Sequence, residues 1–265
     1  MNHHPITVII PCKNEEHNVR DCVASAKLIA DEIIVADSGS TDATMQIARE
    51  NGCRVIAREL VNFGNFKNWA IPQAKNEWVF IIDADERITP QLADEIKQTL
   101  SGDVSKNGFW VARKNHFMGH PVRFGGWGRD RVIRLFRREL GRYVEYTDHT
   151  EVQMASAELG SFKNRMIHYT CWNYDQFLKK MDRYTEQQAD QWLASGRKPS
   201  RFKLITTGPL RFMRDYVFHG GILDGVVGFQ IAALTGFYSF LKQAKFWQKY
   251  HGKRPVTSHA TKKAA

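Results

Sequence analysis

The sequence predicts an α/β fold in which a mostly parallel sheet is covered by helices on both faces. Short apolar segments rich in β-branched residues alternate with segments whose apolar residues recur at helical spacing. This alternation, with strands that are apolar throughout, is typical of a parallel sheet buried between two helical layers. The chain has 265 residues, of which 43% are hydrophobic and 25% charged, so it is able to bury a core and does not have the composition of a disordered chain.

The predicted strands and helices alternate from the beginning of the chain. A β-branched run that ends at Pro11 indicates the first buried strand. Thr89 and Pro90 are typical of the cap and first turn of a helix, with Leu92, Ile96 and Leu100 on one face. The predicted strands cover residues 6–11, 32–37, 54–57 and 78–82, and the predicted helices cover residues 19–29, 43–51 and 89–100.

Polar clusters follow three of the predicted strands. They are Lys13, Asn14 and Glu15 after the first strand, Asp37, Ser38 and Gly39 after the second, and Asp83 and Asp85 after the fourth. Because ligands bind outside the carboxyl ends of the strands in such sheets, we expect the clusters to converge on one edge. Two carboxylates at a spacing of two bind a hard divalent cation through oxygen, although the same pattern also occurs in turns and caps.

Several common sites are disfavoured. The chain has no GxGxxG after the first strand, no GxxxxGK[ST], no GxSxG and no HExxH, which disfavours dinucleotide, P-loop, serine-hydrolase and zincin sites. Its four cysteines lack CxxC spacing. We therefore predict that they are buried, reduced thiols.

Three motifs follow predicted strands: IIPCKNEE at residues 9–16, VADSGSTD at residues 35–42 and IDADE at residues 82–86, with the segment GNFKN at residues 64–68 between the last two. In order and spacing they resemble the motifs of family 2 glycosyltransferases of the GT-A fold, and GNFKN also matches. The resemblance covers residues 5–90. RLFR at residues 134–137 and YVFHGGILDG at residues 216–225 resemble a branch that acts in lipopolysaccharide core assembly.

This resemblance implies an inverting transfer of a sugar from a nucleotide-sugar donor. Glu15 and Asp37 would accept hydrogen bonds from the base and ribose, and Asp83 would lie beside the ribose. Asp85, together with Asp83, would bind Mg²⁺ or Mn²⁺, which bridges the diphosphate and neutralises the leaving group. The donor-binding residues so implied are Pro11, Lys13, Asn14, Glu15, Asp37, Ser38, Gly39, Lys67, Asn68, Asp83 and Arg134.

Inversion requires a base beside the acceptor hydroxyl, and the second half of the chain must supply it. The candidates are Asp130, Asp148, His149 and Glu151, of which we favour Glu151. The related branch commonly has adjacent His and Glu residues after its RLFR segment, whereas Thr150 separates them here. Each candidate has the alternative of a salt-bridged surface group. His168 is either a second metal ligand, a phosphate contact or a hydrogen-bonded core histidine.

The C-terminal region differs in charge from the rest of the chain. Residues 197–265 contain 13 Lys and Arg and 2 Asp and Glu, a net charge of 13 − 2 = +11. We predict a GT-A domain over residues 1–170 and a helical region over residues 171–265, beginning with a helix over 173–194. Basic and apolar residues then alternate, and residues 222–241 are an apolar stretch about as long as a bilayer is thick. The alternative is a soluble helix docked on the first domain.

Together these features predict a membrane-associated glycosyltransferase that extends a lipid-linked saccharide, such as the lipopolysaccharide core or a similar envelope glycan. We expect an anionic membrane surface as its partner and the cytoplasmic face of the inner membrane as its location, with peripheral or monotopic attachment. A polyprenyl-phosphate glycosyltransferase is the first alternative. A non-catalytic nucleic-acid-binding protein would use the same basic tail, but the acidic clusters argue against a nucleic-acid partner.

Overall fold

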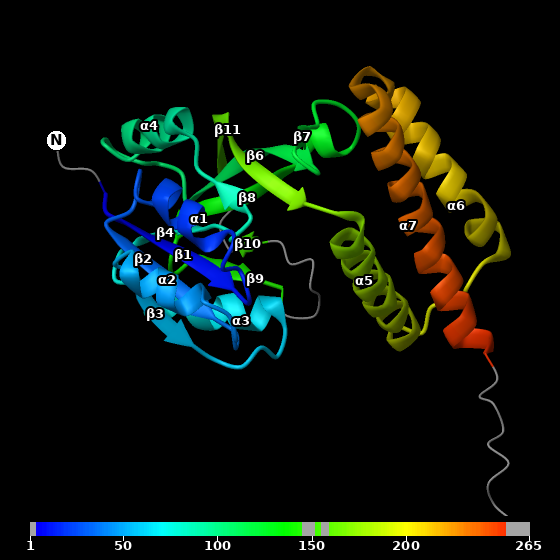
Figure 1. Ribbon diagram of the computed structural model, residues 1–265, viewed down its shortest axis with the longest axis horizontal. Helices are drawn as coiled ribbons and strands as arrows, with labels where there is room; N and C mark the ends of the chain where they lie inside the picture. The colour runs from blue at the N-terminus through cyan, green and yellow to red at the C-terminus, as the bar shows by residue number, and fades with distance from the viewer. Residues whose placement is uncertain (1–3, 145–151, 155–158, 253–265) are drawn as a thin grey trace, which may run out of the picture.

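The computed structural model describes residues 4–144, 152–154 and 159–252. Within these residues, nine strands form one mixed sheet with the order β3-β2-β1-β4-β8-β6-β11-β5, and β7 pairs with β6. The strands are β1 Ile6–Cys12, β2 Glu32–Asp37, β3 Arg54–Ala57, β4 Trp78–Ile81, β5 Glu86–Arg87, β6 Gly108–Phe117, β7 His120–Pro121, β8 Arg131–Arg137 and β11 Leu159–Cys171. Figure 1 shows this sheet with helices on its two faces.

The four predicted strands are confirmed and run parallel. β1 lies between β2 and β4, with Ile10 opposite Val35 and Ile9 opposite Ile81. The later part of the sheet departs from the mostly parallel prediction, because β8 runs antiparallel to both β4 and β6, whereas β11 is parallel to β6. Residues 118–130, between β6 and β8, hold only the short strand β7 and a 3₁₀ turn, without the crossover helix that usually joins a parallel pair.

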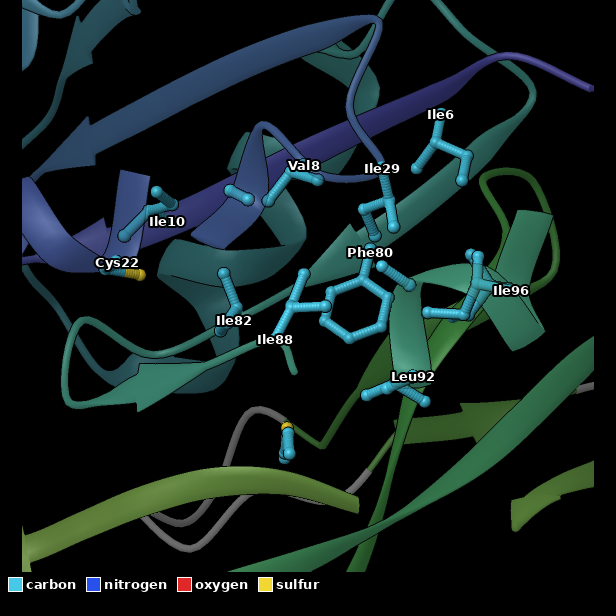
Figure 2. Close-up of a cluster of buried hydrophobic side chains, with 14 of the residues drawn as sticks. Ile6, Val8, Ile10, Cys22, Ile29, Phe80, Ile82, Ile88, Leu92 and Ile96 are labelled. Carbon is cyan, nitrogen blue, oxygen red and sulfur yellow. The ribbon is translucent and has the colours of Figure 1, made fainter. Parts of the chain in front are cut away.

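Four helices cover the sheet: α1 Val19–Ala26, α2 Thr44–Glu50, α3 Phe63–Ala70 and α4 Pro90–Thr99. One hydrophobic cluster joins α1, α2 and α4 to one face, and Figure 2 shows Ile10, Cys22, Phe80, Leu92 and Ile96 pointing into it. A second cluster joins α3 to the other face through buried Phe66 and Ala70. Each fully buried large side chain contributes about 1.5–3 kcal/mol. All four cysteines are free and buried, as predicted.

The helices after the sheet form a layer beside it (Figure 1). α5 Tyr174–Ala194 is the helix predicted over 173–194, and its Asn173 cap accepts a hydrogen bond from the Gln176 amide. α6 Arg201–Met213 and α7 Gly225–His251 form an antiparallel hairpin, joined by a π-helical turn (residues 214–218) and a 3₁₀ turn (residues 221–224). Gly208 and Gly236 meet where the two helices pack, because a Cβ on Gly236 would lie 3.0 Å from the Gly208 carbonyl oxygen. The apolar stretch predicted at 222–241 begins in the 3₁₀ turn and continues as α7, which extends ten residues further, to His251.

The turn of the hairpin is attached to the sheet. The Asp224 carboxylate accepts hydrogen bonds from the amides of Arg123 (3.0 Å) and Phe124 (2.8 Å), and the Gly125 amide donates to the His219 carbonyl at 3.0 Å. These residues precede a 3₁₀ turn, Trp127–Arg129, which leads into β8. The hairpin is thus fixed to the same loop that shapes one side of the site described next.

Candidate active site

The loops that follow β1 and β2 are joined into one unit at the carboxyl edge of the sheet. Asn14 adopts a left-handed conformation (φ 56°), its amide donates to Ser40 Oγ, and its Oδ1 accepts from the Thr41 amide. The Glu15 amide donates to Thr44 Oγ1 at 2.8 Å. As a result, the predicted donor-binding residues of the two loops are held at one edge, although they are about 25 residues apart in sequence.

Two carboxylates of this unit have different surroundings. Asp37 is buried, and both of its oxygens accept a hydrogen bond from the Ser40 amide, at 3.0 and 3.2 Å. Burial raises the pKa of Glu15, and the nearby negative charge of Asp85 acts in the same direction, although Asn18 donates a hydrogen bond to the Glu15 carboxylate. The Ser38 hydroxyl donates to the Cys12 carbonyl, which ties the ends of β1 and β2 together.

Asp83 is held by two cations. Lys67 Nζ lies 2.8 Å from Asp83 Oδ1, and Arg134 Nη2 lies 2.6 Å from Asp83 Oδ2. Burial opposes ionisation, but the positive charges of Arg134 and Lys67 outweigh it and hold the pKa of Asp83 well below its usual range. Asp83 is therefore a carboxylate of fixed orientation, with one-third of its side chain exposed (35%).

The ion pairs continue into the protein. Glu86 is fully buried, and its Oε1 accepts from Arg134 Nη2 at 2.5 Å and from Arg113 Nη1 at 3.2 Å. Arg113 also donates from Nε to Asp130 Oδ2 at 2.7 Å. Three cations thus alternate with three carboxylates from Lys67 to Asp130, so this buried network is neutral. We call these six residues the charge network: Lys67, Asp83, Arg134, Glu86, Arg113 and Asp130.

Asp85 lies beside the charge network without joining it. Its Oδ2 is 3.7 Å from both His168 Nε2 and Lys180 Nζ. Burial would raise the pKa of Asp85, but the positive charges of His168 in its protonated form and of Lys180 lower it. Both distances exceed a hydrogen bond, so this carboxylate, unlike Asp83, is not committed to a protein cation.

The orientation of His168 follows from its neighbour Asn115. The Asn115 side-chain nitrogen donates to the Trp127 carbonyl at 2.7 Å and to Asp130 at 3.1 Å, so its oxygen is the atom that faces His168 Nδ1, at 2.6 Å. An amide oxygen only accepts, and Nδ1 therefore carries the proton. In the neutral ring Nε2 then presents its lone pair toward Asp85.

Asp85 and His168 are near enough to share one divalent cation after a small movement. Neighbouring octahedral ligands each about 2.1 Å from Mg²⁺ lie about 3.0 Å apart, so the two atoms, 3.7 Å apart in the structure, would move toward each other by less than about 1 Å. Among the described residues, no group of three or more His, Cys, Asp or Glu is arranged to hold a metal. A cation here would therefore complete its coordination with water or substrate oxygens.

Other predicted residues lie at or near this edge with different contacts. Lys13 is exposed on the loop after β1, and Pro11 is buried within that strand. The Asn68 side chain makes two hydrogen bonds to the Tyr143 backbone, where β9 Gly141–Tyr143 pairs with β10 Val152–Met154. Asp148, His149 and Glu151 lie outside the described residues.

Of the arginines in and after the RLFR motif, one faces the site. Arg134 is part of the charge network, whereas Arg137 pairs with Glu77 and lies over the Trp78 ring, and Arg138 bonds to the Ala74 carbonyl. β8 ends at Arg137, so Arg138 lies beyond the strand that carries Arg134.

Sequence reasoning assigned no role to Glu86, Arg113, Asn115 or Lys180. Arg113 and Asn115 are two residues apart on β6 and therefore point to the same face, which was a usable signal of an internal polar site. Glu86 stands within the third motif, but its complete burial depends on Arg134 and Arg113 from other strands. No local pattern marks Lys180, which lies on α5.

Comparisons with known proteins agree with this geometry. The family model described as Glycosyl transferase family 2 matches residues 7–155. The chain is 32% identical to a Rhizobium meliloti protein named lipopolysaccharide core biosynthesis glycosyltransferase LpsC, over 93% of each chain. It is 26% identical to an uncharacterized glycosyltransferase of Rickettsia bellii, over 91% of this chain and 85% of the relative.

Solved structures share the fold. The mannosyltransferase PcManGT from Pyrobaculum calidifontis, in complex with GDP-Man and Mn²⁺, aligns with a TM-score of 0.58 at 13% identity. The alignment covers 94% of this chain and 88% of that one. Glucosyl-3-phosphoglycerate synthase from Mycobacterium tuberculosis, in complex with phosphoglyceric acid, aligns with a TM-score of 0.50 at 19% identity, over 74% and 82% of the two chains.

Proposed function

The chain belongs to glycosyl transferase family 2, and we propose that it transfers a sugar from a nucleotide-sugar donor to a lipid-linked saccharide, with inversion at the anomeric carbon. The acceptor we propose is the lipopolysaccharide core or a similar envelope glycan, in keeping with the name of the Rhizobium relative. The observation that carries the proposal is the pair Asp85 and His168, which offers two cation ligands beside the fixed carboxylate of Asp83 at the carboxyl edge of the sheet.

The cofactor of this reaction is a divalent cation, Mg²⁺ or Mn²⁺. Asp85 and His168 Nε2 would hold it, and Asn115 would keep the His168 ring in its metal-binding tautomer. The bound cation supplies positive charge to the departing nucleoside diphosphate. The presence of Mn²⁺ and GDP-Man in the mannosyltransferase of the same fold supports this assignment.

The donor would lie along the edge formed by the loops after β1, β2 and β4. Glu15 and Asp37 would accept hydrogen bonds from the base and ribose. Asp83 is better placed as a ribose acceptor than as a metal ligand, because Lys67 and Arg134 already occupy its two oxygens. With Asp83 as the ribose acceptor, Asp85 would be the main carboxylate ligand of the cation.

Glu151 remains the base that we propose. Val152, the residue that follows it, pairs with Tyr143, and Lys67 Nζ lies 5.0 Å from the Tyr143 ring centroid. Asn68 fixes the Tyr143 backbone through two hydrogen bonds. The described residue next to Glu151 is therefore anchored close to the charge network. Asp130 is the alternative, but it already accepts hydrogen bonds from Arg113 and Asn115.

The α6–α7 hairpin would attach the enzyme to an anionic membrane. Its turn exposes large apolar side chains, with Phe218 76% and Leu223 68% exposed, and the apolar surface continues along α6 through Phe202 and Ile205. Cations occur in the same part of the sequence: Arg197, Lys198, Arg201, Lys203, Arg211 and Arg214, of which the last two pair with the buried Asp215. Exposed apolar side chains with basic residues near them in sequence fit a helix pair lying in the headgroup region.

One helical segment, Gly221–His251, is long and apolar enough to cross a membrane by length and composition alone. However, its Lys245 and Lys249 pair with Asp182, Glu186 and Asp190 of α5. The other end of the segment is attached to the loop before β8, because Asp224 accepts hydrogen bonds from the Arg123 and Phe124 amides. A span in this arrangement would leave the protein bound to the helix on both sides of the membrane. We therefore favour monotopic attachment, at the cytoplasmic face of the inner membrane where nucleotide sugars are available.

A nucleotide-sugar panel tests the proposed function. A true donor at 100 times its dissociation constant stabilises the folded protein by about 2.7 kcal/mol, seen as a rise in melting temperature. We expect one donor to do so in the presence of Mg²⁺ or Mn²⁺, and to a smaller extent in a chelator. Transfer of that sugar to truncated lipopolysaccharide would then identify the acceptor. A panel in which no nucleotide sugar stabilises the protein would contradict the proposal.

A further inference from the structure

Helix α5 carries opposite charges on its two sides. Asp182, Glu186 and Asp190 face α7, where Lys245 lies 2.7 Å from Asp182 Oδ1. Lys180 and Arg183 belong to the side that faces the sheet edge. Figure 1 shows α5 between the sheet and the hairpin, so the helix turns its acidic side to the hairpin and its basic side to the sheet.

The basic side of α5 extends along the candidate donor site. Lys180 Nζ lies 3.7 Å from Asp85 Oδ2 and donates to the Thr170 carbonyl at 3.3 Å. One turn further along, the Arg183 guanidinium lies 5.6 Å from the Phe63 ring, at the start of α3. The helix therefore reaches from the proposed cation ligand Asp85 to the helix that carries Lys67.

Lys180 is held less tightly than Lys67 and Lys245. Lys245 is 13% exposed and has carboxylate oxygens at 2.7 and 3.1 Å, whereas Lys180 is 47% exposed and its nearest carboxylate is 3.7 Å away. Lys67 is likewise buried against Asp83 at 2.8 Å. A half-exposed ammonium with a long contact to one carboxylate is free to take a better anion when one arrives.

We propose that Lys180 binds the diphosphate of the donor, and that it lies beside Asp85 only until donor and divalent cation bind. The inference rests on the proposed function, because it takes a nucleoside diphosphate as the ligand. A divalent cation held by Asp85 would repel the Lys180 ammonium, and a diphosphate bound beside it would be the nearest new anion. The C-terminal helices thus contribute a substrate-binding residue to the sheet edge.

This exchange predicts effects of opposite sign on two ligands. In Lys180→Met, Mn²⁺ alone should bind more tightly than in wild type, because the competing positive charge beside Asp85 is gone. Inorganic pyrophosphate, UDP, GDP and ADP, measured with Mg²⁺ present, should bind roughly 10- to 100-fold more weakly, the usual effect of losing one charge-assisted hydrogen bond. Uridine, guanosine and adenosine should show no difference between the two proteins.

Electron paramagnetic resonance of free Mn²⁺ gives the Mn²⁺ affinity, and calorimetry gives the anion affinities. Both are measured on the full-length chain. Lys179→Met is the matched control, since Lys179 is the adjacent exposed lysine and should leave both affinities unchanged. Lys180→Arg should keep most of the pyrophosphate affinity. If the role of Lys180 were merely structural, Lys180→Met would bind both Mn²⁺ and pyrophosphate more weakly and would have a lower melting temperature.

Equal pyrophosphate affinity in wild type and Lys180→Met would overturn the inference and leave the proposed function intact. Failure of wild type to bind any of the three nucleoside diphosphates would instead count against the proposed function. Pyrophosphate still tests Lys180 in that case, because it needs no particular base. Looser Mn²⁺ binding in Lys180→Met would also contradict the exchange.

Discussion

At the sheet edge, charged side chains face one another and are largely buried, whereas along the C-terminal hairpin apolar side chains and cations face outward. Arg134 is 4% exposed and Glu86 fully buried, while Phe218 and Leu223 are more than two-thirds exposed. Buried paired charges hold a few oxygen and nitrogen atoms in fixed positions, as a site for a small polar ligand requires. An exposed apolar and basic surface instead suits a broad partner such as a membrane.

The largest effect should come from Asp85, the carboxylate after β4 that lies outside the charge network. Asp85→Ala should reduce transfer by at least about 10³-fold and abolish cation-dependent donor binding, because the cation loses a principal ligand. Activity assays and cation-dependent melting shifts measure this. Asp94→Ala, at an exposed position on α4, is the control and should behave as wild type. Normal turnover by folded Asp85→Ala would show that Asp83 or another group holds the cation.

The proposed base should affect turnover without affecting donor affinity. Glu151→Gln removes basicity but keeps the shape, and a general base typically contributes about 10²–10⁴-fold to the rate. We expect kcat to fall within that range while the donor dissociation constant stays constant. Asp130→Asn and Asp148→Asn belong in the same series. If either of them loses turnover and Glu151→Gln does not, the choice of base is wrong.

The two regions should also differ in what their ion pairs contribute to stability. Arg134→Met leaves the fully buried Glu86 with Arg113 and the Asp83 amide as its described partners, and breaking a buried pair costs about 3–5 kcal/mol. Lys249→Met removes pairs whose carboxylates are about half exposed, which should cost about 1 kcal/mol or less and depend on salt. Urea unfolding at two salt concentrations separates the two. Equal losses of unfolding free energy in the two variants would mean that the charge network contributes no more to stability than an exposed ion pair does.

Membrane attachment should depend more on apolar side chains than on charge. Phe218→Asp with Leu223→Asp should release the protein from anionic vesicles, because each inserted large side chain contributes about 1.5–3 kcal/mol. Reversing Arg197, Lys198, Arg201 and Lys203 should weaken binding without abolishing it, at about 1 kcal/mol each near the surface. Vesicle flotation in low and high salt is the measurement, with Leu193→Asp at the end of α5 as control. If wild type does not bind anionic vesicles at low salt, the proposed membrane attachment by the hairpin is wrong.

The smallest effect should be the change in stability with falling pH that depends on Asp83. Burial opposes ionisation of Asp83, but Arg134 and Lys67 hold its pKa well below the usual value of about 3.9. A lowered folded pKa contributes stability that is present above the unfolded pKa and is lost as pH falls through the folded one. The difference in unfolding free energy between wild type and Arg134→Met should therefore shrink below about pH 4. A difference that grows on acidification would contradict the ion pair.

The amino-acid sequence by itself determined the local elements and the order of the motifs. The four parallel strands, the capped helix at Thr89 and the helix α5 were all predictable, because hydrophobic period and capping chemistry act over a few neighbouring residues. The convergence of the loops after β1 and β2 followed as well, since parallel strands end at one edge. The family was identifiable from the same motifs.

Only the tertiary structure decided which side chains meet. Asp83 and Asp85 are equivalent in the sequence pattern, yet Lys67 and Arg134 hold the first, while His168 and Lys180 stand off from the second. The physical reason is that such contacts depend on how β8, β11 and α5 pack against the first strands, and Lys180 is 95 residues from Asp85 along the chain. Burial and ion pairing then give two chemically identical groups different pKa values and different partners.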